Sequence, residues 1–99
     1  GRRRIVRTVT ASYDAPTETV MTACMEAVEA TANILPDPAP AVHLTDYGAS
    51  SIEYTIYCWC TVENYWPAYH SINEKLRDTF AKHNVEMTYD HLNVHILDK

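Results

Sequence analysis

The stretch "SIEYTIYCWCTV" at residues 51–62 decides the fold, because its side chains alternate in character over their whole length. Successive side chains of a β-strand point to opposite faces of the sheet. One face then carries a mostly apolar set: Ile52, Tyr54, Ile56, Cys58, Cys60 and Val62. The other face carries Glu53, Thr55, Tyr57, Trp59 and Thr61. The pattern predicts a long strand whose apolar face is buried beneath helices.

Further strands are predicted on both sides of this one. Alternating residues rich in β-branched side chains predict strands over 4–13 and 41–47. The second of these should form a hairpin with 51–62 around the turn "GAS". The segments "VEM" (85–87) and "LNVHIL" (92–97) predict short strand material at the end of the chain.

Two helices are predicted from apolar residues that recur every three or four positions. The first should have Asp14 as its capping residue and Pro16 in its first turn, and should end before "PDPAP" (36–40). Its apolar stripe consists of Val20, Met21, Cys24, Val28, Ala32 and Leu35. The second should begin near Asn64 with Pro67 in its first turn, and its stripe consists of Tyr69, Ile72, Leu76 and Phe80.

The element order is therefore βαββαβ, and each helix has one apolar stripe. Both helices should cover the same face of a single four-stranded sheet. Right-handed crossovers then place the first and third strands side by side in the centre. The sequence predicts an α+β fold of the ferredoxin-like class, with two helices on one face of the sheet.

Length and composition predict one packed domain over residues 1–99. The chain is 46% hydrophobic, with only two glycines and five prolines, which is typical of a globular domain. No segment approaches the ~20 apolar residues that a membrane helix needs, and none resembles a signal peptide. We expect the fragment to be soluble. Three cysteines, an odd number, favour free thiols in a reducing compartment such as the cytoplasm.

Charge is distributed unevenly along the chain. Four of the eight basic residues, Arg2, Arg3, Arg4 and Arg7, lie at its start. Residues 8–99 hold all 13 acidic residues against the four remaining basic ones, a formal charge of −9. Because an acidic body repels a phosphate backbone, nucleic acid is not an expected partner. The arginine run is predicted to join this domain to a preceding one; an arm for anionic lipid or RNA is the alternative.

Cys58 and Cys60 could in principle bind a metal or do redox chemistry. Alternation instead places both on the buried face, where a thiol behaves as a small apolar side chain. If the hairpin pairs residue 42 with 56 and 44 with 54, the nearest candidate ligand, His43, lies opposite Thr55 on the other face. Side chains two apart on a strand are ~7 Å apart, beyond the reach of a disulfide. We predict core packing, with no metal and no cofactor.

Catalysis is not predicted either. Ser50 and Ser51 lie in a turn without an adjacent base, and the chain has no glycine-rich phosphate loop. The five histidines are scattered, and the i, i+4 pair His91 and His95 has no helix to bring its rings together. An enzyme is therefore not expected.

Tyr57 and Trp59 are the strongest candidates for a functional surface. They lie on the sheet face that neither helix should cover, and exposed aromatic rings favour association once buried. The alternative is that the chain's own loops cover them. RNA-binding sheets also use aromatic rings, but the basic-aromatic pattern of such sheets is missing here. We predict that Tyr57 and Trp59 mark an interface with another surface.

Several segments occur in an order that resembles one family. They are "VTASYDAPTETV", "ILPDPAPAVHLTDYGASSIEY", the "IYCWC" strand, "ENYWPAYHSINEKLRDTF" and "NVHI". Together they resemble the C-terminal cytoplasmic domain of the small-conductance mechanosensitive ion channel family. The resemblance covers about residues 3–97, and its most specific parts are "SYD", "PDPAP" and "GASSI".

The resemblance implies a role that composition and spacing do not give. In that family the domain follows a β domain and a membrane part, and seven subunits form a cytoplasmic vestibule. The channel opens under membrane tension and releases ions and osmolytes in hypo-osmotic shock. This chain would then be a structural part of a homoheptamer, attached to the cell membrane only through a missing N-terminal part. The alternative is a free-standing ferredoxin-like module that binds a ligand or partner.

Overall fold

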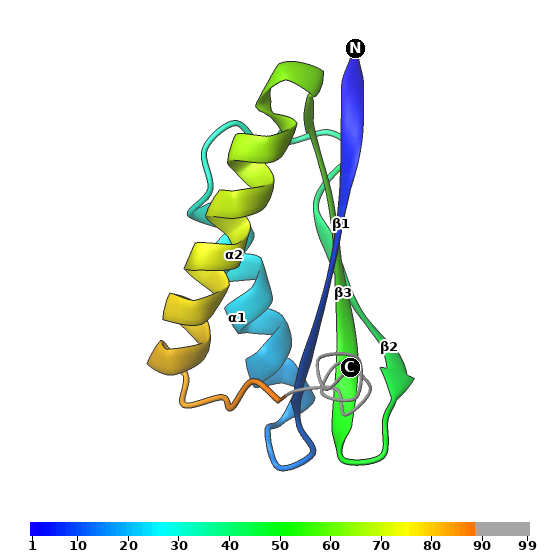
Figure 1. Cartoon of the computed structure of the whole chain (residues 1–99), viewed down its shortest axis with the longest axis vertical. Coiled ribbons are helices and arrows are strands. Elements are labelled where there is room, and N and C mark those ends of the chain that lie inside the picture. Colours follow the sequence, from blue (N-terminus) through cyan, green and yellow to red (C-terminus); the bar gives the residue numbers. More distant parts are fainter. Residues whose placement is uncertain (89–99) are drawn as a thin grey trace, which may run out of the picture.

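A computed structural model describes residues 1–88, which fold into two layers. Two helices cover one face of a three-stranded antiparallel sheet (Figure 1). The elements in chain order are β1 (Arg2–Ser12), α1 (Thr17–Glu29), β2 (Ala41–Tyr47), β3 (Ser51–Thr61), the 3₁₀ turn η1 (Val62–Asn64) and α2 (Tyr65–Lys82). The predicted α+β class, with both helices on one side of a small sheet, is confirmed.

The sheet has the order β1-β3-β2, so the strand that contains "IYCWC" lies between the other two. The prediction that the first and third strands lie side by side is confirmed. The hairpin register is also as predicted, because Val42 pairs with Ile56 and His43 with Thr55. The pairing shifts by one residue between Leu44 and Asp46, an irregularity that alternation did not indicate.

After α2 the chain returns to β1. Met87 forms an isolated antiparallel bridge with Ala11. The Ser12 N–H donates to the Glu86 carbonyl at 3.3 Å, and the Thr88 N–H donates to the Thr10 carbonyl at 3.2 Å. The predicted "VEM" strand is thus a single bridge, and the predicted strand "LNVHIL" (92–97) lies outside the described residues.

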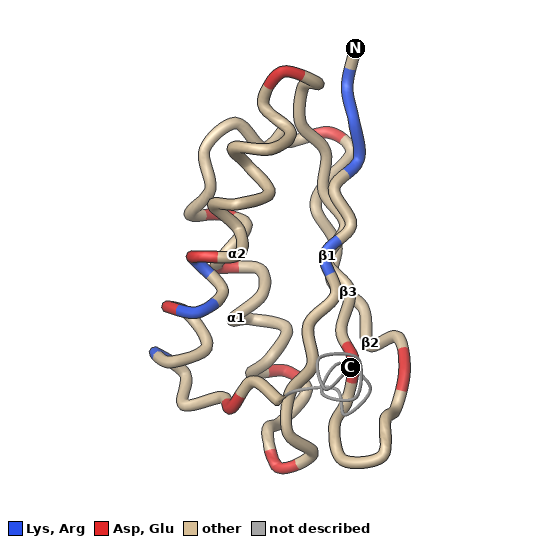
Figure 2. The backbone as a smooth tube through the Cα atoms, in the orientation of Figure 1, with Lys and Arg blue, Asp and Glu red and all other residues tan. Residues whose placement is uncertain are grey.

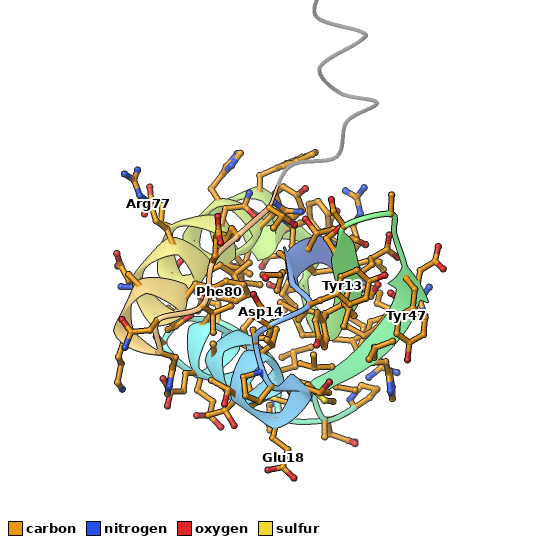
Figure 3. All side chains as sticks on the ribbon, turned by 90° about the horizontal axis from the view of Figure 1, so that it is seen from below. Tyr13, Asp14, Glu18, Tyr47, Arg77 and Phe80 are labelled. Atoms are coloured by element: carbon orange, nitrogen blue, oxygen red, sulfur yellow. The ribbon has the colours of Figure 1, made fainter. Side chains whose placement is uncertain are left out.

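The core lies between the helices and the sheet. Its largest fully buried side chains include Tyr54 from β3 and Phe80 from α2. Figure 3 shows Phe80 pointing into this space, whereas Arg77 and Glu18 point away from the sheet. The inward residues of β3 are all buried, as are Val20, Cys24 and Val28 of α1. Burial of each large apolar side chain contributes about 1.5–3 kcal/mol.

Three local predictions are wrong. The first helix ends at Glu29, so Ala32 and Leu35 are not part of its apolar stripe. Asp14 does not cap that helix: Pro16 is the N-cap, without a side-chain hydrogen bond, and the Asp14 N–H donates to Ser12 Oγ. Val62 is 54% exposed, because the strand ends at Thr61 and the chain turns into η1.

The first helix ends early because other groups satisfy its last carbonyls. The Thr31 hydroxyl donates to the Ala27 carbonyl at 2.8 Å, and the Thr31 N–H donates to the Val28 carbonyl. Asn33 then has a φ of 71°, a left-handed conformation that no helix continues. The Leu35 N–H donates to the Trp59 carbonyl at 2.8 Å, so this loop pairs with β3 just beyond the point where β2 begins.

Figure 2 shows how the charged residues are distributed over the molecule. The arginines of β1 lie toward the end that carries the N-terminus, and acidic residues occur at both ends of the molecule. Within residues 1–88, no helix combines the length and the hydropathy needed to cross a membrane.

Candidate functional site

The candidate site is the sheet face that the helices leave open. Alternation along β1 and β3 brings Arg2, Arg4 and Val6 to this face beside Tyr57 and Trp59. Both rings are only half-buried, in contrast to the inward neighbours of β3. The structure thus confirms the predicted orientation of the two aromatic side chains.

Arginine side chains cover the two rings. The Arg2 guanidinium carbon lies 5.1 Å from the centre of the Trp59 ring, and that of Arg4 lies 5.4 Å from the Tyr57 ring. The register explains the pairing: Arg2 stands opposite Thr61 and Arg4 opposite Trp59, so each reaches the ring two residues along β3. Such contacts are cation–π interactions, worth about 0.5–1 kcal/mol at exposed sites. The rings are therefore in contact with arginines, and the loop before β2 also reaches this part of the sheet, because the Leu35 N–H donates to the Trp59 carbonyl and Arg2 donates to the Asp37 carbonyl.

His43 completes the aromatic part of the site. Its ring centre lies 5.9 Å from that of Tyr57, with the two planes tilted by 54°. His43 belongs to β2 and stands opposite Thr55, as predicted. It therefore lies on the open face, across the sheet from the buried cysteines.

A row of threonines adjoins the rings. Thr55 is only 4% exposed although it lies on the open face. Its hydroxyl is 2.9 Å from that of Thr45 on β2 and 3.4 Å from that of Thr8 on β1. The Thr45 hydroxyl also lies 2.9 Å from a carboxylate oxygen of Glu53. These contacts join all three strands on the side away from the core.

The cysteines have the predicted structural role. Cys24, Cys58 and Cys60 are free and buried. Burial raises the pKa of Cys24 from 9.0 to about 12. Burial, with a smaller contribution from Cys60, raises the pKa of Cys58 to about 11. Burial also raises the pKa of Cys60, against the opposing effect of Arg3. Thiols that stay protonated are poor nucleophiles and metal ligands.

Among the residues that the structure describes, no three His, Cys, Asp or Glu side chains gather closely enough to hold a metal ion. A hollow of about 190 Å³ lies between the end of β1, the start of α1 and the chain after α2. Its border mixes polar residues such as Asp14, His83 and Glu86 with the apolar residues Ala15, Pro16 and Val85.

Sequence reasoning missed a second aromatic cluster, at the start of α2. Tyr65, Trp66, Tyr69 and His70 contact one another through ring centres 4.9–6.1 Å apart. The Arg3 guanidinium lies 3.8 Å from the Tyr65 ring, and Trp66 is 56% exposed. The signal was available in "YWPAYH", because rings at i, i+1, i+4 and i+5 meet on one side of a helix.

Comparisons with known proteins give the same family for sequence and fold. Residues 5–87 match the family model described as "Mechanosensitive ion channel MscS, C-terminal". The small-conductance mechanosensitive channel of Edwardsiella ictaluri is 26% identical over 95 residues, which are 96% of this chain and 33% of that protein. An MscS family protein of Haemophilus influenzae is 24% identical over 94% of this chain and 8% of its own length.

Solved structures share the fold. The crystal structure of Helicobacter pylori MscS in its closed state has a TM-score of 0.82 at 20% identity, over 90% of this chain and 36% of that one. Arabidopsis thaliana MSL1 has a TM-score of 0.72 at 19% identity, over 90% of this chain and 34% of that one. The chain thus spans about a third of the first relative's length and of these two structures. With its family model matched from residue 5 to residue 87, this chain belongs to the family of the C-terminal domain of the mechanosensitive ion channel MscS.

Proposed function

We propose that this chain is the cytoplasmic domain of a longer mechanosensitive channel in the cell membrane. The channel opens under membrane tension and releases ions and osmolytes in hypo-osmotic shock. The match of residues 5–87 to the C-terminal family model carries the proposal. The relatives extend well beyond the region that this chain matches, so the pore and the tension sensor belong to the rest of the protein. The domain itself has a structural role in a homoheptameric vestibule.

The assembly role rests on the open face of the sheet. Tyr57 and Trp59 form a subunit interface there, with the guanidinium groups of Arg2 and Arg4 stacked on their rings. Large rings with polar edges are typical of the residues that contribute most to protein interfaces. Stacked arginines hold the rings in fixed positions, which reduces the entropy lost on association.

The test uses the full-length protein in a bacterial strain that lacks its own mechanosensitive channels. Survival of a hypo-osmotic downshock and a tension-activated conductance in membrane patches are the expected results. A protein that reaches the membrane but gives no conductance under tension would overturn the proposed function. Substitution of both rings, Tyr57→Ala with Trp59→Ala, should lower the yield of assembled oligomer. Tyr47→Ala is the matched control, since Tyr47 is 66% exposed at the other end of the sheet.

We also propose that "LNVHIL" (92–97) completes a four-stranded ferredoxin-like sheet along the outer edge of β1. The bonds of Thr10 and Ser12 to residues 86–88 support this, because they direct the chain along that edge. Along a strand, the backbone N–H groups of every second residue point to the same edge of the sheet. The amides of Val6 and Thr8 therefore point to the outer edge of β1, as those of Thr10 and Ser12 do.

Hydrogen exchange tests the fourth strand. In the full chain the amides of Val6 and Thr8 should be protected, and truncation after Thr88 should make them exchange much faster. The amides of Ile5 and Val9 point toward β3 and serve as internal controls. Rapid exchange of Val6 and Thr8 in the full chain would argue against a fourth strand.

A further inference from the structure

Two exposed patches of opposite charge lie at the end of the molecule that carries the N-terminus. The basic patch consists of Arg2, Arg4, Val6, Tyr57 and Trp59 on the open face of the sheet. The acidic patch consists of Val62, Glu63 and Trp66, where β3 turns through η1 into α2; Glu63 is its one carboxylate, and Arg3 lies beside it on the Tyr65 ring. The Val62 N–H donates to the Gly1 carbonyl at 3.2 Å, which holds the start of β1 beside η1. The two patches therefore lie at the same height along the molecule.

Each patch exposes an unusual amount of apolar surface. Val6 is 42% exposed in the basic patch. Val62 is 54% and Trp66 56% exposed in the acidic patch. An exposed apolar group surrounded by polar residues is typical of a protein-binding surface. Both patches thus have the composition of an interface, but they belong to different sides of the fold.

The charges of both patches lack partners of opposite sign. Within residues 1–88, the ion pairs of the molecule are those of Glu26 with Lys82 and His83, and none includes Arg2, Arg4 or Glu63. A guanidinium group stacked on a ring still directs its N–H groups outward in its own plane. Arg4 is therefore held in position to receive a carboxylate from outside the molecule, whereas one N–H of Arg2 already donates to the Asp37 carbonyl at 3.4 Å.

We propose that the acidic patch of one copy docks on the basic patch of a neighbouring copy. Glu63 then receives hydrogen bonds from Arg4, while Trp66 and Val62 pack beside Val6 and the two rings. A contact between different patches is heterologous, and heterologous contacts generate rings when the rotation closes. Because both patches lie at the same end of the molecule, they can meet when neighbouring copies stand side by side in the same orientation. This inference rests on the proposed assembly role and identifies the second surface of that interface.

A charge exchange tests the pairing in the 99-residue chain by sedimentation equilibrium at about 50 mM salt. Arg4→Glu and Glu63→Arg should each weaken association by about tenfold, because each places like charges together. The combined variant should restore the wild-type association constant to within about threefold. Trp66→Ala should also weaken association, since it removes the largest exposed ring of the acidic patch.

Matched controls use the other end of the molecule. Glu18→Arg makes the same charge change at the start of α1, and it should neither weaken association nor rescue Arg4→Glu. Tyr47→Ala removes an equally exposed ring and should have no effect. Unfolding by urea, followed for each variant, separates lost association from lost folding.

Three results would overturn the pairing. The first is a wild-type chain that stays monomeric up to about millimolar concentration. The second is a combined variant no better than the single ones. The third is inorganic phosphate that binds the wild type but not Arg4→Glu, with association unchanged, which would make the basic patch a small-anion site. Weakening by Trp59→Ala without any effect of the charge exchange would retain the proposed assembly role and exclude only the acidic patch.

Discussion

At the scale of single residues, alternation places buried and partly exposed side chains next to one another within five positions of β3. Cys58 and Cys60 point inward and are fully buried, whereas Tyr57 and Trp59 point outward beneath arginine side chains. The environment sets the chemistry of the thiols. Burial removes water from the thiolate, so the protonated form is favoured and the pKa rises.

The raised thiol pKa values predict a loss of stability in alkali. A group that binds its proton more tightly in the folded chain stabilises the fold fully below its ordinary pKa of 9.0. This contribution is lost as the pH rises from 9.0 toward the folded values of about 11 for Cys58 and about 12 for Cys24. Each such thiol should lower the free energy of unfolding by about 1.4 kcal/mol per pH unit in that window.

Urea unfolding under reducing conditions between pH 8 and pH 11 measures this effect. Cys58→Ala is the control, because it removes one titrating thiol and leaves every tyrosine and lysine in place. Above pH 9, the free energy of unfolding of the variant should fall less steeply with pH than that of the wild type. The difference should equal the contribution of one titrating thiol. Identical slopes for the two proteins would contradict the assignment.

At the scale of elements, the hydroxyl row on the open face predicts a specific loss of stability. Thr55→Val keeps the shape of the side chain but removes its contacts with Thr8 and Thr45. Because these contacts join three strands and Thr55 is buried, the free energy of unfolding should fall by about 1 kcal/mol. Thr22→Val, on the exposed side of α1, is the control, and an equal loss there would point to a general effect of valine.

The ion pairs that join Glu26 of α1 to Lys82 and His83 at the end of α2 should weaken at low pH. A hydrogen bond from His83, at 3.0 Å, contributes most to lowering the pKa of Glu26, and Lys82 at 3.4 Å adds to it. A carboxylate with a lowered pKa stabilises the fold above its ordinary pKa and loses that effect as the pH falls through the lowered value. In a carboxyl NMR titration, His83→Ala should raise the Glu26 midpoint more than Lys82→Ala does. The reverse order would contradict this account.

Sequence patterns predicted elements and register more accurately than element ends. The pairing of Val42 with Ile56 followed from keeping apolar residues on one face, because a one-residue slip would expose the whole set. The apolar spacing that continues to Leu35 did not reveal where α1 stops. That end depends on the Thr31 hydroxyl and on Asn33, both local contacts that compete with the helix.

The candidate site was predicted only in part, because a local sequence pattern does not reveal contacts between distant parts of the chain. Period-two alternation was enough to place Tyr57 and Trp59 on the open face. Their rings contact arginines that are more than 50 positions away in the chain, and only the antiparallel register brings these together. Trp66 was missed because a helix stripe was sought only for the core, and an exposed ring has no part in that pattern.

At the scale of the whole molecule, the isolated domain should be a monomer at micromolar concentration and associate weakly above it. Stable protein interfaces bury about 1,200–2,000 Å². Here Tyr57 and Trp59 are already partly buried within the domain, so a neighbour can cover only the area of the two rings that is still exposed. The remaining contacts are single exposed side chains and ion pairs, which contribute little each.

Salt should therefore control this weak association. Exposed ion pairs are screened over about 8 Å at physiological ionic strength and over about 3 Å at 1 M. Light scattering of the wild type at rising concentration should detect association at low salt and much less at 1 M salt. A sharp heptamer at micromolar concentration, unchanged by salt, would contradict the prediction. It would mean that this domain alone carries the assembly energy, through apolar contacts larger than those of the two patches.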